Sequence, residues 1–334
     1  MPESQLHIIF ASIFMKTRVA IVDFGTNTFH VLVADLEGMD YLFIHKEKIH
    51  VALGKGGINF SVITPEGANR AFSAAYHIKS LFDLYKVEIT KGVATSALRS
   101  SGNSSEIISR LKEITGIDIE IITGEKEAAY IFEGVSLAMK LNVADSLVID
   151  IGGGSVEFIV GNPSGIKWMK SIEIGAQRLT DEFQQNDPIL PHEIRNIEQH
   201  LIDKLTPLYQ ALNIYRPKTL IGSSGTFDTL SEIFRKRNSI EDTPDQTELP
   251  LTIEGIKDIY LEIISKNRAE RMQIPGMIEM RVDLIVVASI LIQSVLNMTS
   301  FEEVRVSSYS LKEGIFAEFL NIWCNFKHGN TWPS

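Results

Sequence analysis

The chain has 334 residues, and at about 150 residues per domain this length predicts two domains. The 32 Lys and Arg residues against 42 Asp and Glu residues give a net charge of −10. Broad contact with duplex nucleic acid needs a positive face, so the charge argues against that partner. The single cysteine, Cys324, excludes an internal disulfide and a cysteine-rich zinc site. Any anionic ligand must therefore be held locally, by backbone N–H groups, a few cations or a metal ion.

Two apolar stretches could be mistaken for membrane segments. Leu6–Met15 lacks the positive start and the small-residue cleavage site of a signal peptide. We expect translation to start at Met15, with an upstream extension before it; an extra strand or a tail is the alternative. Asp283–Met298 is shorter than the ~20 residues of a membrane span and includes polar side chains, so it predicts a buried core helix. We expect no membrane partner and a cytoplasmic location.

Hydrophobic periodicity predicts two rounds of similar elements. The first round consists of strands Arg18–Phe24, Thr28–Asp35 and Tyr41–Ile49, a helix that Thr64 caps and that extends to Tyr85, strand Gly92–Thr95, helix Ser105–Thr115, strand Ile117–Ile122 and helix Glu125–Lys140. The second consists of strands Ser146–Ile151, Ser155–Gly161 and Ile166–Ile172, helices Ala176–Gln185 and His192–Leu212, strand Thr219–Ile221, helix Thr226–Arg237, an exposed loop Asn238–Pro250, helices Thr252–Lys266 and Val282–Asn297, strand Glu303–Ser307 and helix Tyr309–Phe326. The repetition predicts a duplicated α/β architecture.

Each round contains the same kind of turn between its first two strands. Asp23–His30 aligns without gaps on Asp150–Glu157, and Asp, Gly and a hydroxyl residue coincide. The turns themselves are Gly25, Thr26, Asn27, Thr28 and Gly152, Gly153, Gly154, Ser155. Such turns can aim several N–H groups at one phosphate, and a divalent metal ion would offset the aspartate before each turn. The alternative is a pair of ordinary tight hairpin turns.

Three further segments could take part in phosphate chemistry. Arg99 follows a strand of small residues and could bind a phosphate, or it could be a surface arginine. Glu127, in the first turn of a predicted helix, could be a general base, or it could only complement the helix dipole. Ser224, Gly225 and Thr226 lie where a buried strand meets a helix N-terminus, which suits an anion. Walker A and GxGxxG motifs are absent from the sequence, and the glycine-rich turns join two strands.

Six short motifs occur in order and together resemble the exopolyphosphatase/guanosine pentaphosphatase (Ppx/GppA) family. They are DFGTNTFH from Asp23, ATSALR from Ala94, GEKEA from Gly124, VIDIGGGSVE from Val148, GAQRL from Gly175 and GSSGT from Gly222. The resemblance implies an actin-like fold of two ribonuclease-H-like domains, residues 16–122 plus 309–330 and residues 123–308, with a cleft between them. By analogy with such folds, we expect the last helix to pack on the first domain.

The resemblance also implies a reaction and roles for residues. It implies release of terminal phosphate from inorganic polyphosphate, or from guanosine pentaphosphate, with Mg²⁺. Glu127 matches the base that activates water, Arg99 a phosphate-binding arginine, and Asp150 and Glu157 acidic residues that act with metal and water; with Asp23 they are the candidate metal ligands. Long family members continue with further domains, so we expect limited processive handling of long polyphosphate. A homodimer is compatible with the sequence.

Two other classes of protein remain open from the sequence. A non-catalytic sensor of alarmones or polyphosphate could use the same cleft, although the intact Glu127, Asp150 and Glu157 argue against it. An ATP-dependent kinase or chaperone on an actin-like scaffold is the other alternative. Phosphate release from polyphosphate without an ATP requirement would count against that alternative.

Overall fold

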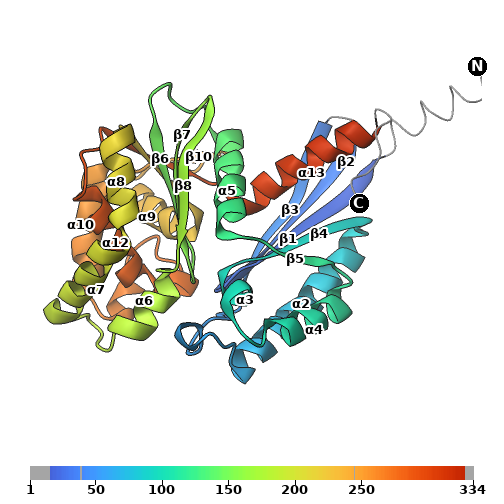
Figure 1. Ribbon diagram of the computed structural model, residues 1–334, viewed down its shortest axis with the longest axis horizontal. Helices are drawn as coiled ribbons and strands as arrows, with labels where there is room; N and C mark the ends of the chain where they lie inside the picture. Colours follow the sequence, from blue (N-terminus) through green and yellow to red (C-terminus); the bar gives the residue numbers. More distant parts are fainter. Residues whose placement is uncertain (1–15, 38–39, 244, 328–334) are drawn as a thin grey trace, which may run out of the picture.

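The computed structural model describes residues 16–37, 40–243 and 245–327. The predicted start at Met15 and the extension before it lie outside these residues, as do residues 328–330 of the predicted first domain. Two α/β halves lie side by side, and each is built on one sheet (Figure 1). The domain boundaries at residues 122/123 and 308/309 stay a prediction.

The first sheet has the order β3-β2-β1-β4-β5 within the described residues. Its strands are β1 (Thr17–Phe24), β2 (Thr28–Glu37), β3 (Asp40–His50), β4 (Ile89–Ala94) and β5 (Ile119–Ile121). β1 pairs antiparallel with β2 and parallel with β4. Both faces of β1 are covered, since Val19 and Ile21 pack on one side and Ala20, Val22 and Phe24 on the other. This explains why the strand reads as a continuous apolar run.

The second sheet repeats that order and adds one edge strand. In the described chain its order is β10-β11-β9-β6-β7-β8. The strands are β6 (Ser146–Ile151), β7 (Val156–Asn162), β8 (Gly165–Ile172), β9 (Thr219–Ser223), β10 (Glu248–Leu249) and β11 (Glu303–Ser307). β6 pairs antiparallel with β7 and parallel with β9, as β1 does with β2 and β4. The predicted duplicated α/β architecture is therefore confirmed.

Helices cover both faces of each sheet, and two of them cross between the halves. The helices are α2 (Pro65–Tyr85), α3 (Ser96–Ser100), α4 (Ser104–Thr115), α5 (Gly124–Ala138), α6 (Ala176–Phe183), α7 (Pro191–Lys204), α8 (Thr206–Tyr215), α9 (Ser224–Arg237), α10 (Ile253–Ser265), α11 (Arg268–Arg271), α12 (Ile285–Leu296) and α13 (Leu311–Lys327), with short 3₁₀ helices at Ile58–Phe60 and Glu279–Arg281. α5 follows β5 but packs on β7 and β8, whereas α13 follows β11 but packs on β1 and β2. α5 and α13 also pack on each other between the sheets (Figure 1). The predicted return of the last helix to the first half is thus confirmed.

Several predicted elements differ from the structure: β4, β5 and α12 have bounds shifted by up to three residues, and α3 was not predicted. The helix predicted over His192–Leu212 is two helices, α7 and α8, which meet at Leu205; Pro207, which has no N–H to donate, lies in the first turn of α8. The predicted loop Asn238–Pro250 contains β10, which pairs with β11. The helix predicted to begin at Thr226 begins at Ser224.

The apolar stretch Asp283–Met298 contains α12, most of whose side chains are buried in the core of the second half. The predicted buried helix is confirmed there. Within the described ranges, no helix combines the length and the apolar character that crossing a bilayer requires.

Candidate active site

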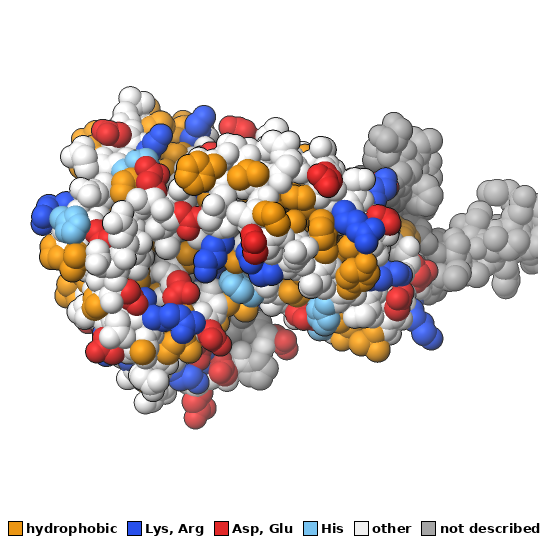
Figure 2. Space-filling model, turned by 90° about the horizontal axis from the view of Figure 1, so that it is seen from below, with side chains coloured by type: hydrophobic (Ala, Val, Ile, Leu, Met, Phe, Trp, Pro, Cys, Tyr) orange, Lys and Arg blue, Asp and Glu red, His pale blue; other side chains and the backbone are white. Residues whose placement is uncertain are grey.

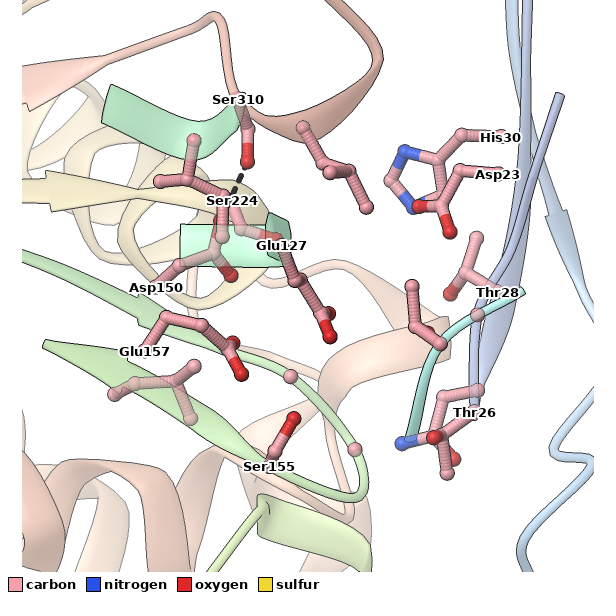
Figure 3. Close-up of a pocket in the computed structure, with 18 of the residues that line it drawn as sticks. Asp23, Thr26, Thr28, His30, Glu127, Asp150, Ser155, Glu157, Ser224 and Ser310 are labelled. Carbon is pink, nitrogen blue, oxygen red and sulfur yellow. Dashed lines mark hydrogen bonds between the residues drawn. The ribbon is translucent and has the colours of Figure 1, made fainter. Parts of the chain in front are cut away.

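A cleft lies between the two sheets, and the two predicted loops line it from opposite sides. Asp23, Thr26 and Thr28 come from the first half, and Asp150, Ser155 and Glu157 come from the second (Figure 3). Glu127 of α5 lies between these two groups (Figure 3). The cavity is narrow, with a volume of about 70 Å³.

The two loops contact each other directly. A Cβ atom added to Gly153 would lie 2.8 Å from Cγ of Asn27 and 3.0 Å from Cβ of Thr26. One added to Gly154 would lie 2.4 Å from Oγ of Ser96. The glycines of the second loop are therefore required for close contact with the first half, in addition to any contact with a ligand.

Glu127 is buried, and its carboxylate is paired with an arginine. Thr123 caps α5 by accepting a hydrogen bond from the N–H of Lys126, which fixes the first turn that carries Glu127. Nη1 of Arg99 donates to Oε2 of Glu127 at 2.8 Å and to the carbonyl oxygen of Ile122 at 3.2 Å. Burial raises the pKa of Glu127 to about 7, although Arg99 opposes the shift. A carboxylate with this pKa can accept a proton near neutral pH.

Three more buried carboxylates surround the cavity. Burial is the main cause that raises the pKa values of Asp23, Asp150 and Glu157, and the charge of Glu127 adds to it for Asp23 and Glu157. Asp150 accepts hydrogen bonds from the hydroxyls of Ser223 and Ser310 (Figure 3 shows the second). Glu157 accepts one from Ser171 at 2.7 Å. Several buried carboxylates in one cleft favour either protonation of some of them or a bound cation.

The donors suit the hard cation that the sequence predicts. Oδ1 of Asp23 is buried and has no hydrogen-bond partner. Across the described residues, no three Asp, Glu, His or Cys side chains converge tightly enough to hold a metal ion by themselves. Mg²⁺ usually takes only one or two carboxylates and completes its shell with water and substrate phosphate oxygens, so the carboxylates here fit it in that manner.

Of the three predicted residues at the start of α9, only Ser224 lines the cavity, and the predicted Arg99 does not line it either. Ser224 lines the cavity and has a positive φ of 71° at the turn from β9 into α9. Gly225 instead packs on Arg281, because a Cβ atom there would lie 2.2 Å from Nη2 of that guanidinium. Thr226 is buried behind the turn. Arg99 reaches the site through its contact with Glu127.

The structure adds basic side chains that the sequence did not single out for this site. Lys312 is buried, lines the cavity and contacts Glu313 at 3.0 Å. His30 also lines it, and burial, together with the charges of Lys312, Lys48 and Arg281, holds the pKa of His30 well below its ordinary value. His30 lies in the repeated octet Asp23–His30, so the sequence carried a signal for this residue.

One cation gave no signal in the sequence. Nζ of Lys48 forms an ion pair at 2.6 Å with Asp228, so β3 and α9 are joined across the cleft. The two residues are 180 positions apart, and neither belongs to a motif.

Comparisons with known proteins agree with the motifs. A model of the Ppx/GppA phosphatase family matches residues 32–322. Exopolyphosphatase 1 of Mycobacterium tuberculosis is 26% identical over 312 residues, which cover 91% of this chain and 88% of that protein. The crystal structure of an exopolyphosphatase from Cytophaga hutchinsonii has a TM-score of 0.88 and 40% identity, and covers 91% of this chain and 98% of that one.

A more distant structure extends the likeness in fold. The Ppx/GppA family member of Aquifex aeolicus has a TM-score of 0.72 at 24% identity, with 95% of this chain and 100% of that one covered. Together with the repeated strand order, these likenesses confirm the predicted actin-like, duplicated ribonuclease-H-like fold.

Proposed function

The chain belongs to the Ppx/GppA phosphatase family, and from that premise we propose that it hydrolyses the terminal phosphoanhydride bond of inorganic polyphosphate. The observation that carries the proposal is the position of Glu127, buried between two facing loops and poised to accept a proton near pH 7. The relatives named exopolyphosphatase support the choice of substrate.

In the proposed reaction, a water molecule attacks the terminal phosphorus atom. Glu127 accepts a proton from this water as the new P–O bond forms, and the bridging P–O bond breaks on the opposite side. The shortened polyphosphate leaves with the bridging oxygen and its electron pair. Residues 25–28 and 152–155 hold the terminal phosphoryl group between them, and burial excludes competing water.

The proposal includes Mg²⁺ beside the carboxylates of Asp23, Asp150 and Glu157. When bound, it would neutralise part of the negative charge on the phosphate oxygens. Lys312, which is buried at the cavity, adds a fixed positive charge on the side of α13. Burial opposes this charge, but Glu313 holds the pKa of Lys312 above its ordinary value, so the side chain stays protonated at neutral pH.

Phosphate release separates this proposal from its alternatives. We expect the protein to release orthophosphate from tripolyphosphate and from long polyphosphate without ATP, and to lose this activity when EDTA removes divalent metal ions. Guanosine pentaphosphate in a parallel assay measures the alternative activity. Release from guanosine pentaphosphate alone would overturn the proposed substrate, and binding of all three compounds without release would favour a sensor.

A further inference from the structure

Beside the cleft, one carboxylate is held by groups that would suit a phosphate. Glu173 lies in the connection between β8 and α6. Its Oε1 accepts a hydrogen bond from Nη2 of Arg99 at 3.2 Å. Its Oε2 accepts one from Nη2 of Arg178 at 2.7 Å and one from the hydroxyl of Ser96 at 2.7 Å. Two guanidinium groups and a hydroxyl, from both halves of the molecule, therefore converge on one anion.

Other contacts hold the two arginines in place. Arg178 donates from Nε to the carbonyl oxygen of Gly154 at 2.8 Å and from Nη1 to that of Ile58 at 2.9 Å. Arg99 donates from Nη1 to Glu127 and to the carbonyl oxygen of Ile122. Because none of these contacts involves Glu173, the donors would stay aimed at the same point if that carboxylate moved away.

Glu173 is the most exposed of the three charged side chains. It retains 44% of its side-chain accessibility, against 19% for Arg99 and 13% for Arg178. An ion pair with such exposure is screened by water and contributes little to stability. The carboxylate can therefore turn to solvent at small cost when a more highly charged anion competes for the arginines.

The cluster adjoins the loop that would hold the terminal phosphoryl group. Arg178 contacts the backbone of Gly154, and Ser96 packs so closely on Gly154 that no side chain fits there. Arg99 connects the cluster to Glu127 on the other side. A chain of phosphates whose end lies at the loop would place its next group at this cluster.

We propose that Ser96, Arg99 and Arg178 form a subsite for the second phosphate group of the substrate, and that Glu173 occupies this subsite in the free protein. The inference rests on the proposed function, because it takes the ligand to be an oligophosphate. Glu173 then sets the affinity for that ligand by competing with it, and its displacement frees Arg99 for the substrate. A bound phosphate would replace Glu173 as the bridge between the two halves.

The substitution Glu173→Gln tests this subsite. Gln keeps the shape of the side chain but loses the charge that competes with phosphate. Glu182→Gln is the matched control, because Glu182 is an exposed acidic residue of α6 and its substitution changes the net charge equally. Isothermal titration with imidodiphosphate, whose bridging nitrogen resists hydrolysis, measures binding without turnover.

We expect Glu173→Gln to bind imidodiphosphate about three to ten times more tightly than the wild-type protein, and Glu182→Gln to bind within about twofold of it. In steady-state kinetics with tripolyphosphate at pH 9, where Glu127 is ionised with or without the nearby charge of Glu173, Glu173→Gln should lower KM without raising kcat. Equal or weaker binding by Glu173→Gln would overturn the proposal. The proposal would also be overturned if neither the wild-type protein nor either variant bound imidodiphosphate.

These results also separate the subsite from the proposed function. If the wild-type protein releases no phosphate from tripolyphosphate while Glu173→Gln binds imidodiphosphate more tightly, the function fails and the subsite stands. If the wild-type protein releases phosphate from tripolyphosphate, but the wild-type protein and Glu173→Gln bind imidodiphosphate with equal affinity, the proposed subsite is wrong and the proposed function stands.

Discussion

At the scale of single residues, burial rather than residue type gives the site its chemistry. Glu127 is an ordinary glutamate in sequence, and its pKa of about 7 follows from its buried place between two halves that are far apart along the chain. The motifs predicted Glu127, Asp150 and the two loops as site residues, and the structure brings them together in one cleft. The contacts of Glu173 with Ser96 and Arg99 could not be predicted, since no local pattern reports a pairing over more than seventy residues.

The pKa of Glu127 predicts the pH dependence of the reaction. A general base acts when ionised, so kcat/KM for tripolyphosphate should fall about tenfold per pH unit below pH 7 and level off above it. Rates measured from pH 5 to 9 test this, with the affinity for imidodiphosphate over the same range as the control for ionisation of the ligand. A flat profile between pH 5 and 7, after that correction, would exclude Glu127 as the base.

At the scale of elements, the contact between α5 and α13 positions the site. A Cβ atom on Gly134 of α5 would lie 2.0 Å from the carbonyl oxygen of Ser310, and one on Gly314 of α13 would lie 1.8 Å from that of Tyr130. The helices can approach this closely only because glycine occupies both positions. α5 carries Glu127 and α13 carries Lys312, so this contact brings both residues into one cleft.

Gly134→Ala should therefore destabilise the protein, although alanine is the better helix former. We expect the free energy of unfolding to fall by about 1–3 kcal/mol, because the backbones must move apart. Urea denaturation measures the change. Gly102→Ala is the control, since the nearest atom to its added Cβ is 3.8 Å away, and it should change stability by less than about 0.5 kcal/mol. Equal stability of the two variants would show that the helices tolerate separation.

The strands were easier to predict than the breaks between helices. Val19, Ile21 and Val22 belong to a run that is buried on both faces, and such runs can be recognised from composition alone. The division of α7 from α8 depended on one proline, Pro207, within an apolar pattern that continues across it. β10 forms through pairing with β11, more than fifty residues away, and its own sequence carries no strand signal.

At the scale of the whole molecule, contacts between the halves narrow the cleft. Lys48 and Asp228 join them at one place, and Glu173 joins them at another through Ser96 and Arg99. The remaining cavity of about 70 Å³ holds little more than a few water molecules. In the binding mode that we propose, an oligophosphate replaces the contacts of Glu173 with Ser96 and Arg99.

The surface predicts how the protein treats long polyphosphate. The net charge is −10, and acidic and basic side chains are intermixed on the face shown in Figure 2. Phosphate units that extend beyond the cleft would therefore gain little electrostatic attraction from the protein surface. We expect kcat/KM per chain end to change by less than about threefold from tripolyphosphate to chains of hundreds of units. A steep rise with chain length would reveal a basic path outside the cleft.

The central claim is that Glu127 activates water against a terminal phosphoryl group, and Glu127→Gln tests it most directly. Phosphate release from tripolyphosphate should fall by about 10²–10⁴, the usual loss when a general base is removed. Binding of imidodiphosphate should remain, because the loops and Arg178 are unchanged. Near-normal phosphate release by the folded variant would contradict the account.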